Sequence, residues 1–128
     1  MNMTMTKKKI FVVDDDRDVT MVVKSRLESA GYDVEVANSG TEGLHRIKEK
    51  RPYLVVLDVM MEDVTGYEIC AELKDGPFSD LPVIMLTSRV KAVDEKFGYM
   101  CKADAYIRKP QSGELLVPQI KKLLGEDK

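Results

Sequence analysis

The sequence of 128 residues lacks the features that mark several classes of protein. Its two cysteines, Cys70 and Cys101, stand alone, without the spacing of a metal site. No apolar run approaches the ~20 residues that cross a bilayer. The segment from Met1 to Thr6 lacks the apolar stretch of a secretory signal. We therefore expect a cytoplasmic chain with reduced thiols that does not insert into a membrane.

The sequence also lacks an excess of positive charge. It has 20 Lys and Arg against 22 Asp and Glu, which gives a formal net charge of -2. Domains that bind nucleic acids usually carry a basic excess or a basic stripe. We therefore expect no direct contact with nucleic acid.

Repeats and low-complexity segments are absent too, and the length suits one globular domain. We predict a single domain over residues 1–128, with a lead-in at 1–7 and a tail at 125–128. The apolar pattern of the last predicted helix ends at Leu124, four residues before the end of the sequence. We therefore expect no attached output domain.

What the sequence does contain is a fivefold alternation of short apolar runs and amphipathic stretches. Apolar residues at helical spacing follow each run, as in helices that cover a sheet. This alternation predicts an α/β fold with a five-stranded parallel sheet. Right-handed crossovers make it a doubly wound, flavodoxin-like fold with strand order 2-1-3-4-5 and five helices. The predicted strands are 10–13, 33–36, 53–57, 83–86 and 105–107.

Local signals place several helix boundaries. Asp16 is predicted to cap the first helix, which should stop at Gly31. Thr41 is predicted to cap the second helix. The fourth helix is expected over residues 90–100. Pro118 lies in the pattern of the last helix, and we expect it within the first turns, where proline costs less.

Polar residues stand at the ends of four predicted strands. Strand 1 ends in Asp14 and Asp15, strand 3 in Asp58, strand 4 in Thr87 and strand 5 in Lys109. Ligands of such sheets bind beyond the carboxyl ends of the strands, where the strand order reverses. We therefore expect these five side chains to meet at one edge of the sheet.

Three carboxylates in one place repel one another, at roughly 4 kcal/mol per pair for ~4 Å and an effective dielectric near 20. An oxygen-only ligand set favours a hard cation, Mg²⁺ above Zn²⁺. Lys109 could then bind a phosphoryl oxygen as a point charge, and Thr87 could donate a hydrogen bond to another. With this support, Asp58 could act as a nucleophile and form an aspartyl phosphate.

Four segments together resemble the response-regulator receiver domain of two-component signalling, in its stand-alone, CheY-like form. They occur in the family's order and spacing, and the resemblance runs from about Lys8 to Leu124. The segments are Val12-Val13-Asp14-Asp15, Val56-Leu57-Asp58-Val59-Met60-Met61, Met85-Leu86-Thr87-Ser88 and Tyr106-Ile107-Arg108-Lys109-Pro110.

The resemblance implies a metal-dependent phosphoacceptor. Asp58 would accept the phosphoryl group from a sensor histidine kinase or a phosphotransfer protein. Asp14 and Asp15 would hold Mg²⁺ together with Asp58 and the backbone carbonyl of Met60. Lys109 would pair with the phosphoryl group, and the Lys109–Pro110 peptide would be cis.

The resemblance also implies an output. Thr87 would shift toward the phosphoryl group and let Tyr106 turn inward. This would change the surface of helix 4, strand 5 and helix 5, where a downstream protein would dock. The resemblance further implies a bacterial signalling protein that is not an enzyme beyond its own phosphorylation and dephosphorylation. We expect a monomer or a weak dimer.

Three positions depart from the family pattern. Glu62 stands where a proline commonly stiffens the loop after the phosphoacceptor, Lys102 where glycine is usual, and Gln111 where an aromatic residue is common. We expect these departures to affect partner choice and phosphoryl lifetime. The small Ser88 fits the pattern and should leave Asp58 reachable.

Three other functions are compatible with parts of the sequence. A receiver-like adaptor would bind partners without phosphorylation. A small phosphatase would use an aspartyl nucleophile in the Asp14-x-Asp16 spacing, although Asp18 does not suit that motif. A flavin carrier would need a phosphate loop rich in glycine and hydroxyl groups, where this chain has three aspartates.

Overall fold

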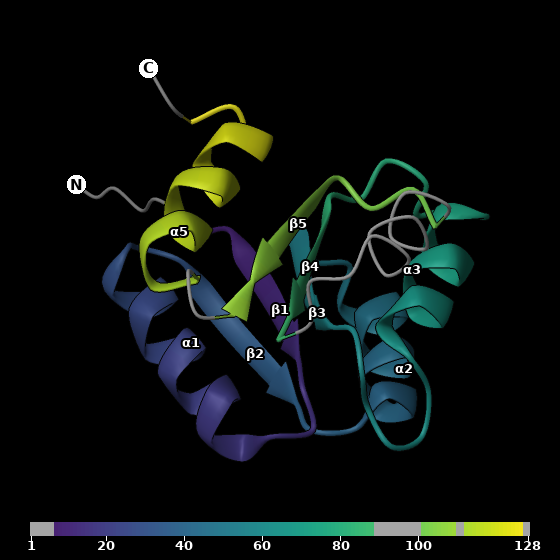
Figure 1. The fold of residues 1–128 in the computed structure, drawn as a ribbon. Helices are drawn as coiled ribbons and strands as arrows, with labels where there is room; N and C mark the ends of the chain where they lie inside the picture. The colour runs from purple at the N-terminus through teal and green to yellow at the C-terminus, as the bar shows by residue number, and fades with distance from the viewer. Residues whose placement is uncertain (1–6, 89–100, 110–111, 127–128) are drawn as a thin grey trace.

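The computed structural model describes residues 7–88, 101–109 and 112–126. In these ranges five strands alternate with four helices (Figure 1). The helix expected over 90–100 falls outside the described residues. So do Pro110 and Gln111, and with them the expected cis peptide before Pro110.

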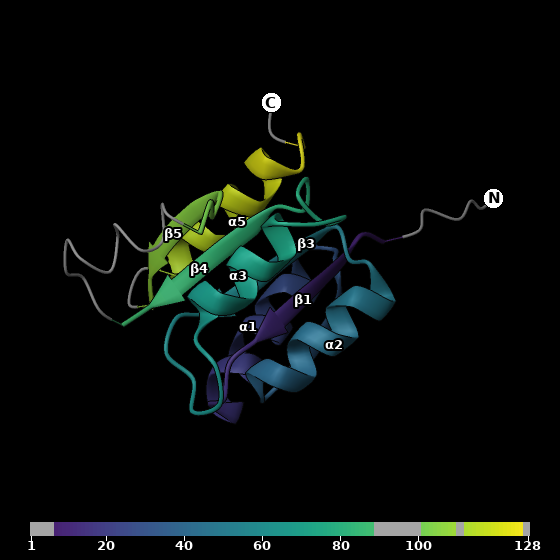
Figure 2. The same ribbon diagram turned by 90° about the vertical axis from the view of Figure 1, so that its right-hand side faces the viewer.

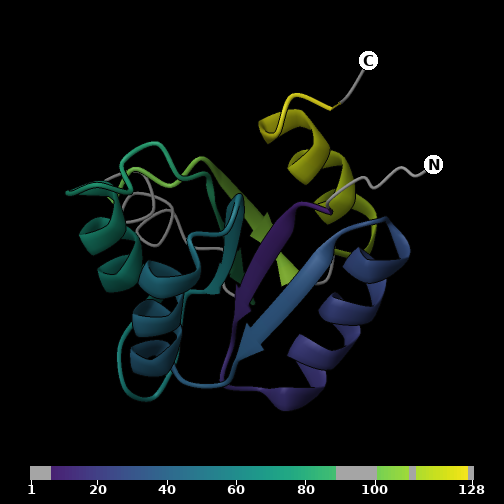
Figure 3. The ribbon, with the colours of Figure 1, turned by 180° about the vertical axis from the view of Figure 1, so that it is seen from behind.

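The strands form one parallel sheet with the order β2-β1-β3-β4-β5, as predicted. The order reverses between β1 and β3, because β1 is followed by β2 on one side and the chain then crosses to β3 on the other. Figure 3 shows β2 at the sheet edge beside β1. The strands are β1 (Lys9–Val13), β2 (Asp33–Ala37), β3 (Leu54–Asp58), β4 (Val83–Thr87) and β5 (Ala105–Arg108).

Two pairs of helices cover the two faces of the sheet (Figures 1 and 2). The helices are α1 (Arg17–Ser29) and α5 (Ser112–Leu123) on one face, and α2 (Gly40–Lys50) and α3 (Gly66–Lys74) on the other. Among the described residues, no helix has the length and apolar character needed to cross a bilayer.

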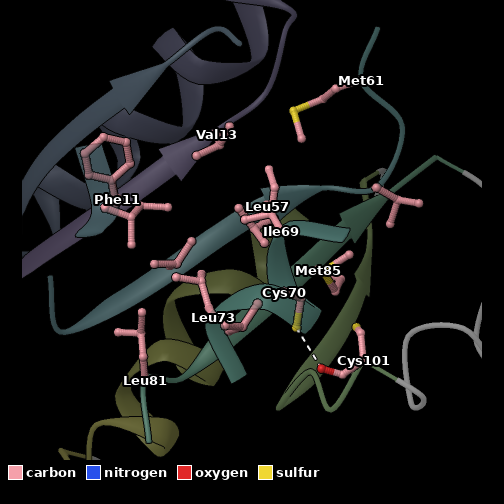
Figure 4. Close-up of a cluster of buried hydrophobic side chains, with 14 of the residues drawn as sticks. Phe11, Val13, Leu57, Met61, Ile69, Cys70, Leu73, Leu81, Met85 and Cys101 are labelled. Atoms are coloured by element: carbon pink, nitrogen blue, oxygen red, sulfur yellow. Dashed lines mark hydrogen bonds between the residues drawn. The ribbon is translucent and has the colours of Figure 1, made fainter. Parts of the chain in front are cut away.

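A hydrophobic core lies on each face of the sheet. The side chains of β1 contribute to the two cores in turn, since successive strand residues point to opposite faces. Ile10 packs with Leu27 of α1 and Leu116 of α5. Phe11 packs in the other core with Ile69 of α3 (Figure 4). All five residues of β3 are buried, which confirms its central position.

Two of the predicted boundaries of the first helices are confirmed and one is wrong. Asp16 caps α1 by accepting hydrogen bonds from Asp18 and Val19 backbone N–H groups, and α1 stops before Gly31. Ser39, and not Thr41, caps α2. Ser39 keeps the extended backbone of a cap residue, whereas Thr41 already lies in the first helical turn.

The start of β3 also differs from the prediction. The strand begins at Leu54, while Tyr53 is 54% exposed and has the ammonium of Lys8 5.7 Å from its ring centre. An apolar run alone does not show which end residue leaves the sheet. The strand instead extends one residue further and includes Asp58.

Pro118 lies within the first two turns of α5, as predicted, but the expectation that proline costs less there is wrong. Pro118 is the seventh residue of α5 and therefore lies beyond the first turn, whose N–H groups have no helical partner. Its ring removes a backbone hydrogen bond that the helix would otherwise make.

The segments at the two ends of the described chain lie side by side. Lys8 forms an ion pair of 2.8 Å with Glu126, and the Tyr32 hydroxyl donates to the same carboxylate at 2.7 Å. These contacts attach Glu126, three residues after the end of α5, to the residue before β1 and to the residue before β2.

Candidate functional site

The carboxyl edge of the sheet carries the five polar side chains that strand order predicted. Asp14 and Asp15 follow β1 directly, Asp58 and Thr87 are the last residues of β3 and β4, and Lys109 follows β5. Because all strands are parallel, these ends lie on the same edge.

Asp14, Asp15 and Asp58 form a compact acidic cluster. Each can offer one carboxylate oxygen such that the three oxygens lie within 4.8 Å of one another. Asp14 and Asp58 are buried, with 2% and 6% exposure, whereas Asp15 is exposed. The cluster therefore has two buried carboxylates and one that is open to solvent.

Lys109 neutralises part of this charge. Its Nζ lies 3.0 Å from Asp14 Oδ2 and 3.0 Å from Asp58 Oδ1. Burial opposes the charge on the ammonium, but the two carboxylates outweigh it and raise the pKa of Lys109. Lys109 therefore remains positively charged between the Asp14 and Asp58 carboxylates.

The Asp58 carboxylate is unusually basic. Burial raises the pKa of Asp58 to about 6, and the Asp14 carboxylate adds to this while Lys109 opposes it. Asp58 is therefore mostly ionised at neutral pH, although its surroundings disfavour the charged form.

The cluster fits a hard divalent cation by its chemistry. Among the described residues, Asp14 Oδ2 is buried and accepts no hydrogen bond, although it faces Lys109 across the ion pair of 3.0 Å. A buried carboxylate oxygen in that position has capacity for a further positive partner. Oxygen donors without nitrogen or sulfur suit Mg²⁺ or Ca²⁺.

Backbone and side-chain contacts fix the inner carboxylate. Asp14 Oδ1 accepts from the Asp16 backbone N–H at 2.9 Å. Asn38 donates to the Asp14 carbonyl at 2.8 Å and to Thr20 Oγ1 at 3.0 Å. On the far side, Ser112 donates to the Lys109 carbonyl at 2.9 Å. The site is thus supported from α1, β2 and α5.

The start of α3 approaches Asp58 closely. A Cβ atom at Gly66 would lie 2.2 Å from the Asp58 carbonyl oxygen, so only glycine fits there. The Gly66 backbone N–H donates to the Val59 carbonyl, and the Val59 N–H donates to Leu86. This packing sets the path of the loop that leaves Asp58.

The predicted site residues Thr87, Met60 and Tyr106 differ in what the structure shows of them. Thr87 is 1% exposed at the end of β4. Met60 has an exposed side chain, and a role for its carbonyl stays a prediction. Tyr106 is partly buried, and its hydroxyl lies 2.8 Å from that of Tyr67. Its role in a switch also stays a prediction.

The sequence prediction missed three residues that support this region, namely Asn38, Asp63 and Tyr67. Asn38 and Asp63 stand in polar turns, where such residues are ordinary, and no spacing links them to the acidic cluster. Tyr67 follows Gly66 without a local signal. Only the folded chain shows their partners.

Lys102, which stands where the family usually has glycine, has a positive backbone φ angle. Its φ is 66°, in the left-handed region where glycine is favoured and a side chain is strained. The backbone of this chain therefore keeps a conformation that suits glycine while carrying lysine. The neighbouring Cys101 and its contact Cys70 are both buried, neither forms a disulfide, and the Cys70 thiol donates to the Cys101 carbonyl (Figure 4).

Comparison with known proteins agrees with this fold. The chain matches the family model described as response regulator receiver domain over residues 10–121. It is 40% identical over 120 residues to the response regulator MprA of Mycobacterium tuberculosis, covering 94% of this chain and 52% of that protein. The chain spans about half the length of the curated relatives it matches.

Solved structures show the same architecture. A CheY-like response regulator receiver domain protein from Methanospirillum hungatei superposes with a TM-score of 0.88 at 32% identity, covering 94% of this chain and 96% of that one. The chemotaxis protein CheY4 of Vibrio cholerae gives 0.86 at 27% identity, with 92% and 99% coverage. This chain belongs to the response regulator receiver domain family.

Proposed function

We propose that this receiver domain is a phosphorylation-dependent switch whose phosphoacceptor is Asp58. The observation that supports this most directly is the buried Asp58 carboxylate, held within 3.0 Å of Lys109 and beside two further carboxylates. A carboxylate that is ionised at neutral pH but poorly solvated is suited to act as a nucleophile.

The proposed reaction moves a phosphoryl group from a phosphohistidine to Asp58. A carboxylate oxygen of Asp58 forms a bond to phosphorus while the phosphorus–nitrogen bond of the donor breaks. The released imidazole takes up a proton from solvent. The donor is a sensor histidine kinase or a phosphotransfer protein, as the family membership supports.

Asp14, Asp15 and Asp58, with the carbonyl of Met60, would hold the Mg²⁺ ion. When bound, Mg²⁺ offsets the charge of the acidic cluster and of the incoming phosphoryl group. Lys109 is proposed to pair with a phosphoryl oxygen, and its ion pair with Asp58 supports this role. Thr87 is proposed to donate a hydrogen bond to another phosphoryl oxygen.

The proposed output is a change of the surface around β5 and α5. A groove of about 540 Å³ lies there, with Leu115 46% exposed at its side. We propose that phosphorylation moves Thr87 and Tyr106 and thereby changes this groove for a downstream protein. Its lining is Tyr106, Ile107, Leu115, Val117, Pro118, Gln119, Lys121 and Lys122.

Three properties of the chain stay predictions: that it stands alone, that it is cytoplasmic, and that it is a monomer or a weak dimer. The curated relatives are about twice as long as the matched region, so the output could also pass to an attached domain. The proposed chemistry at Asp58 is the same in both arrangements.

The test is phosphorylation by a small acyl phosphate with Mg²⁺, measured by intact mass. We expect one added phosphoryl group on the wild type and none on Asp58→Asn. Asp33→Asn, which changes an exposed carboxylate at the opposite end of the sheet, serves as the matched control and should be modified normally. An unmodified wild type would favour the adaptor, and a modified Asp58→Asn would show a different acceptor.

A further inference from the structure

The loop between β3 and α3, residues 59–65, is attached to α2 by one side chain. Asp63 Oδ2 accepts from the Thr41 backbone N–H at 2.8 Å and from Ser39 Oγ at 2.9 Å. Asp63 Oδ1 accepts from the Gly40 backbone N–H at 3.1 Å. These donors belong to the start of α2, where unpaired N–H groups and the helix dipole favour a negative charge.

The ionised form of Asp63 is strongly favoured. The hydrogen bonds from Thr41, first among those from α2, hold the pKa of the Asp63 carboxyl far below its ordinary range. The side chain is therefore charged at any pH at which the protein functions. Charge-assisted hydrogen bonds of this kind are stronger than neutral ones.

Close packing supports the same attachment. A Cβ atom at Gly40 would lie 2.4 Å from Val64 Cγ2 and 3.1 Å from Asp63 Oδ1. The absence of a side chain at Gly40 therefore lets the loop lie directly against the start of α2. The attachment combines hydrogen bonds with a fitted contact between two backbone segments.

The residue before Asp63 reaches the acidic cluster. The backbone N–H of Glu62 donates to Asp15 Oδ2 at 3.1 Å. Proline, which is common at this position in the family, has no N–H and could not make this bond. Glu62, which stands in place of that proline, thus provides a donor to Asp15, the exposed member of the cluster.

We propose that Asp63 is a positioning residue for the acidic site: by fixing the loop to α2, it holds the Glu62 N–H against Asp15 and orients that carboxylate for a divalent cation. The inference rests on the proposed binding of Mg²⁺ and assigns a role to a residue outside the ligand set. Outer partners of metal ligands commonly act in this way.

A purely structural role makes a different prediction. If Asp63 only stabilises the start of α2, its removal lowers the free energy of unfolding and leaves the Mg²⁺ affinity of the folded protein unchanged. The matched control is Asp104, an acid at the opposite edge of the sheet. It accepts from the Val83 N–H at 2.8 Å and from Lys74 at 2.7 Å, far from the cluster in the fold.

The experiment is calorimetric titration of the unphosphorylated protein with MgCl₂. We expect Asp63→Ala to bind Mg²⁺ about tenfold more weakly, the usual scale for loss of an outer partner. Asp63→Asn keeps one acceptor oxygen and a good capping residue, so it should fold and recover most of the affinity. Asp104→Ala should lose stability but keep the wild-type affinity.

Hydrogen exchange of the Glu62 amide gives a second reading that needs no metal. We expect faster exchange in Asp63→Ala than in the wild type, and an intermediate rate in Asp63→Asn. Wild-type Mg²⁺ affinity in folded Asp63→Ala, or an unchanged Glu62 exchange rate, would overturn the proposal. A wild type without Mg²⁺ affinity would instead refute the proposed function, and the exchange rates would still decide the role of Asp63.

Discussion

Asp58 is the residue in which burial and charge conflict most directly. Burial and Asp14 raise its pKa to about 6, from the ordinary 3.8, while Lys109 counteracts part of the shift. A carboxyl group whose pKa is higher in the folded state binds more protons there than in the unfolded chain. Its ionisation therefore destabilises the fold, and the stability falls as pH rises from about 4 to about 6.

Asp58→Asn should remove this penalty. A rise of the Asp58 pKa from 3.8 to about 6 on folding corresponds to about 3 kcal/mol at neutral pH, and we expect the variant to be more stable than the wild type by about 1–3 kcal/mol at pH 7. The two proteins should have similar stability near pH 4, where Asp58 is mostly protonated. Urea unfolding at several pH values, with a chelator present, measures the difference. Parallel pH curves for the two proteins would contradict the predicted shift.

The sequence alone predicted the residues of the acidic cluster but not the residues whose hydrogen bonds hold the surrounding loops in place. Asp14, Asp58 and Lys109 stand at strand ends, and strand order places such ends together. Asn38 and Asp63 act through partners about two dozen positions away in the sequence. Nothing in the local sequence distinguishes them from turn residues, because the contact exists only once separate loops meet.

Among the elements, α5 shows a local rule that the sequence breaks. Pro118 lies inside the helix, although α5 buries Leu116 and Ile120 in the core beside α1. Packing of this apolar face stabilises the helix in spite of the lost hydrogen bond. The helical pattern and the place of the proline in its first turns were therefore predicted correctly, while the low cost expected for that place was not.

Pro118→Ala should stabilise the domain by about 1–3 kcal/mol, since it restores a helical hydrogen bond and removes a ring clash. Thermal and urea unfolding of the unphosphorylated protein measure this. Gln119→Ala, one residue further along the same helix, is the control and should change stability by less than about 0.5 kcal/mol. Equal stability of the wild type and Pro118→Ala would show that the helix already accommodates proline without cost.

At the start of α2, tertiary contacts determine which of two nearby residues caps the helix. Both Ser39 and Thr41 are good N-cap residues by type. Ser39 takes the cap, and Thr41 gives its backbone N–H to Asp63 from the next loop. The boundary is thus set by a contact between two loops and could not be found from either segment alone.

At the scale of the whole molecule, a divalent cation should stabilise the fold. Mg²⁺ at about 100 times its Kd is expected to add about 2.7 kcal/mol, because it binds a site that only the folded chain assembles. Asp14 and Asp58 approach each other only through the pairing of β1 with β3.

Unfolding with MgCl₂, with a chelator and with NaCl at equal ionic strength measures this effect. The gain should appear with MgCl₂ alone and should be greatly reduced in Asp58→Asn, which lacks one proposed ligand. Equal stabilisation by NaCl would instead indicate screening of the acidic surface without a specific site.

The sequence by itself determined the parallel sheet, its order and the polar residues at its carboxyl edge. This follows because hydrophobic periodicity fixes the elements, and the handedness of crossovers fixes how they are arranged. Tertiary structure alone decided how strongly the site is constrained: the raised pKa of Asp58, the Tyr67–Tyr106 contact and the attachment of Asp63 to α2. Each depends on distances between groups far apart in the chain, and those distances exist only after the two cores have packed.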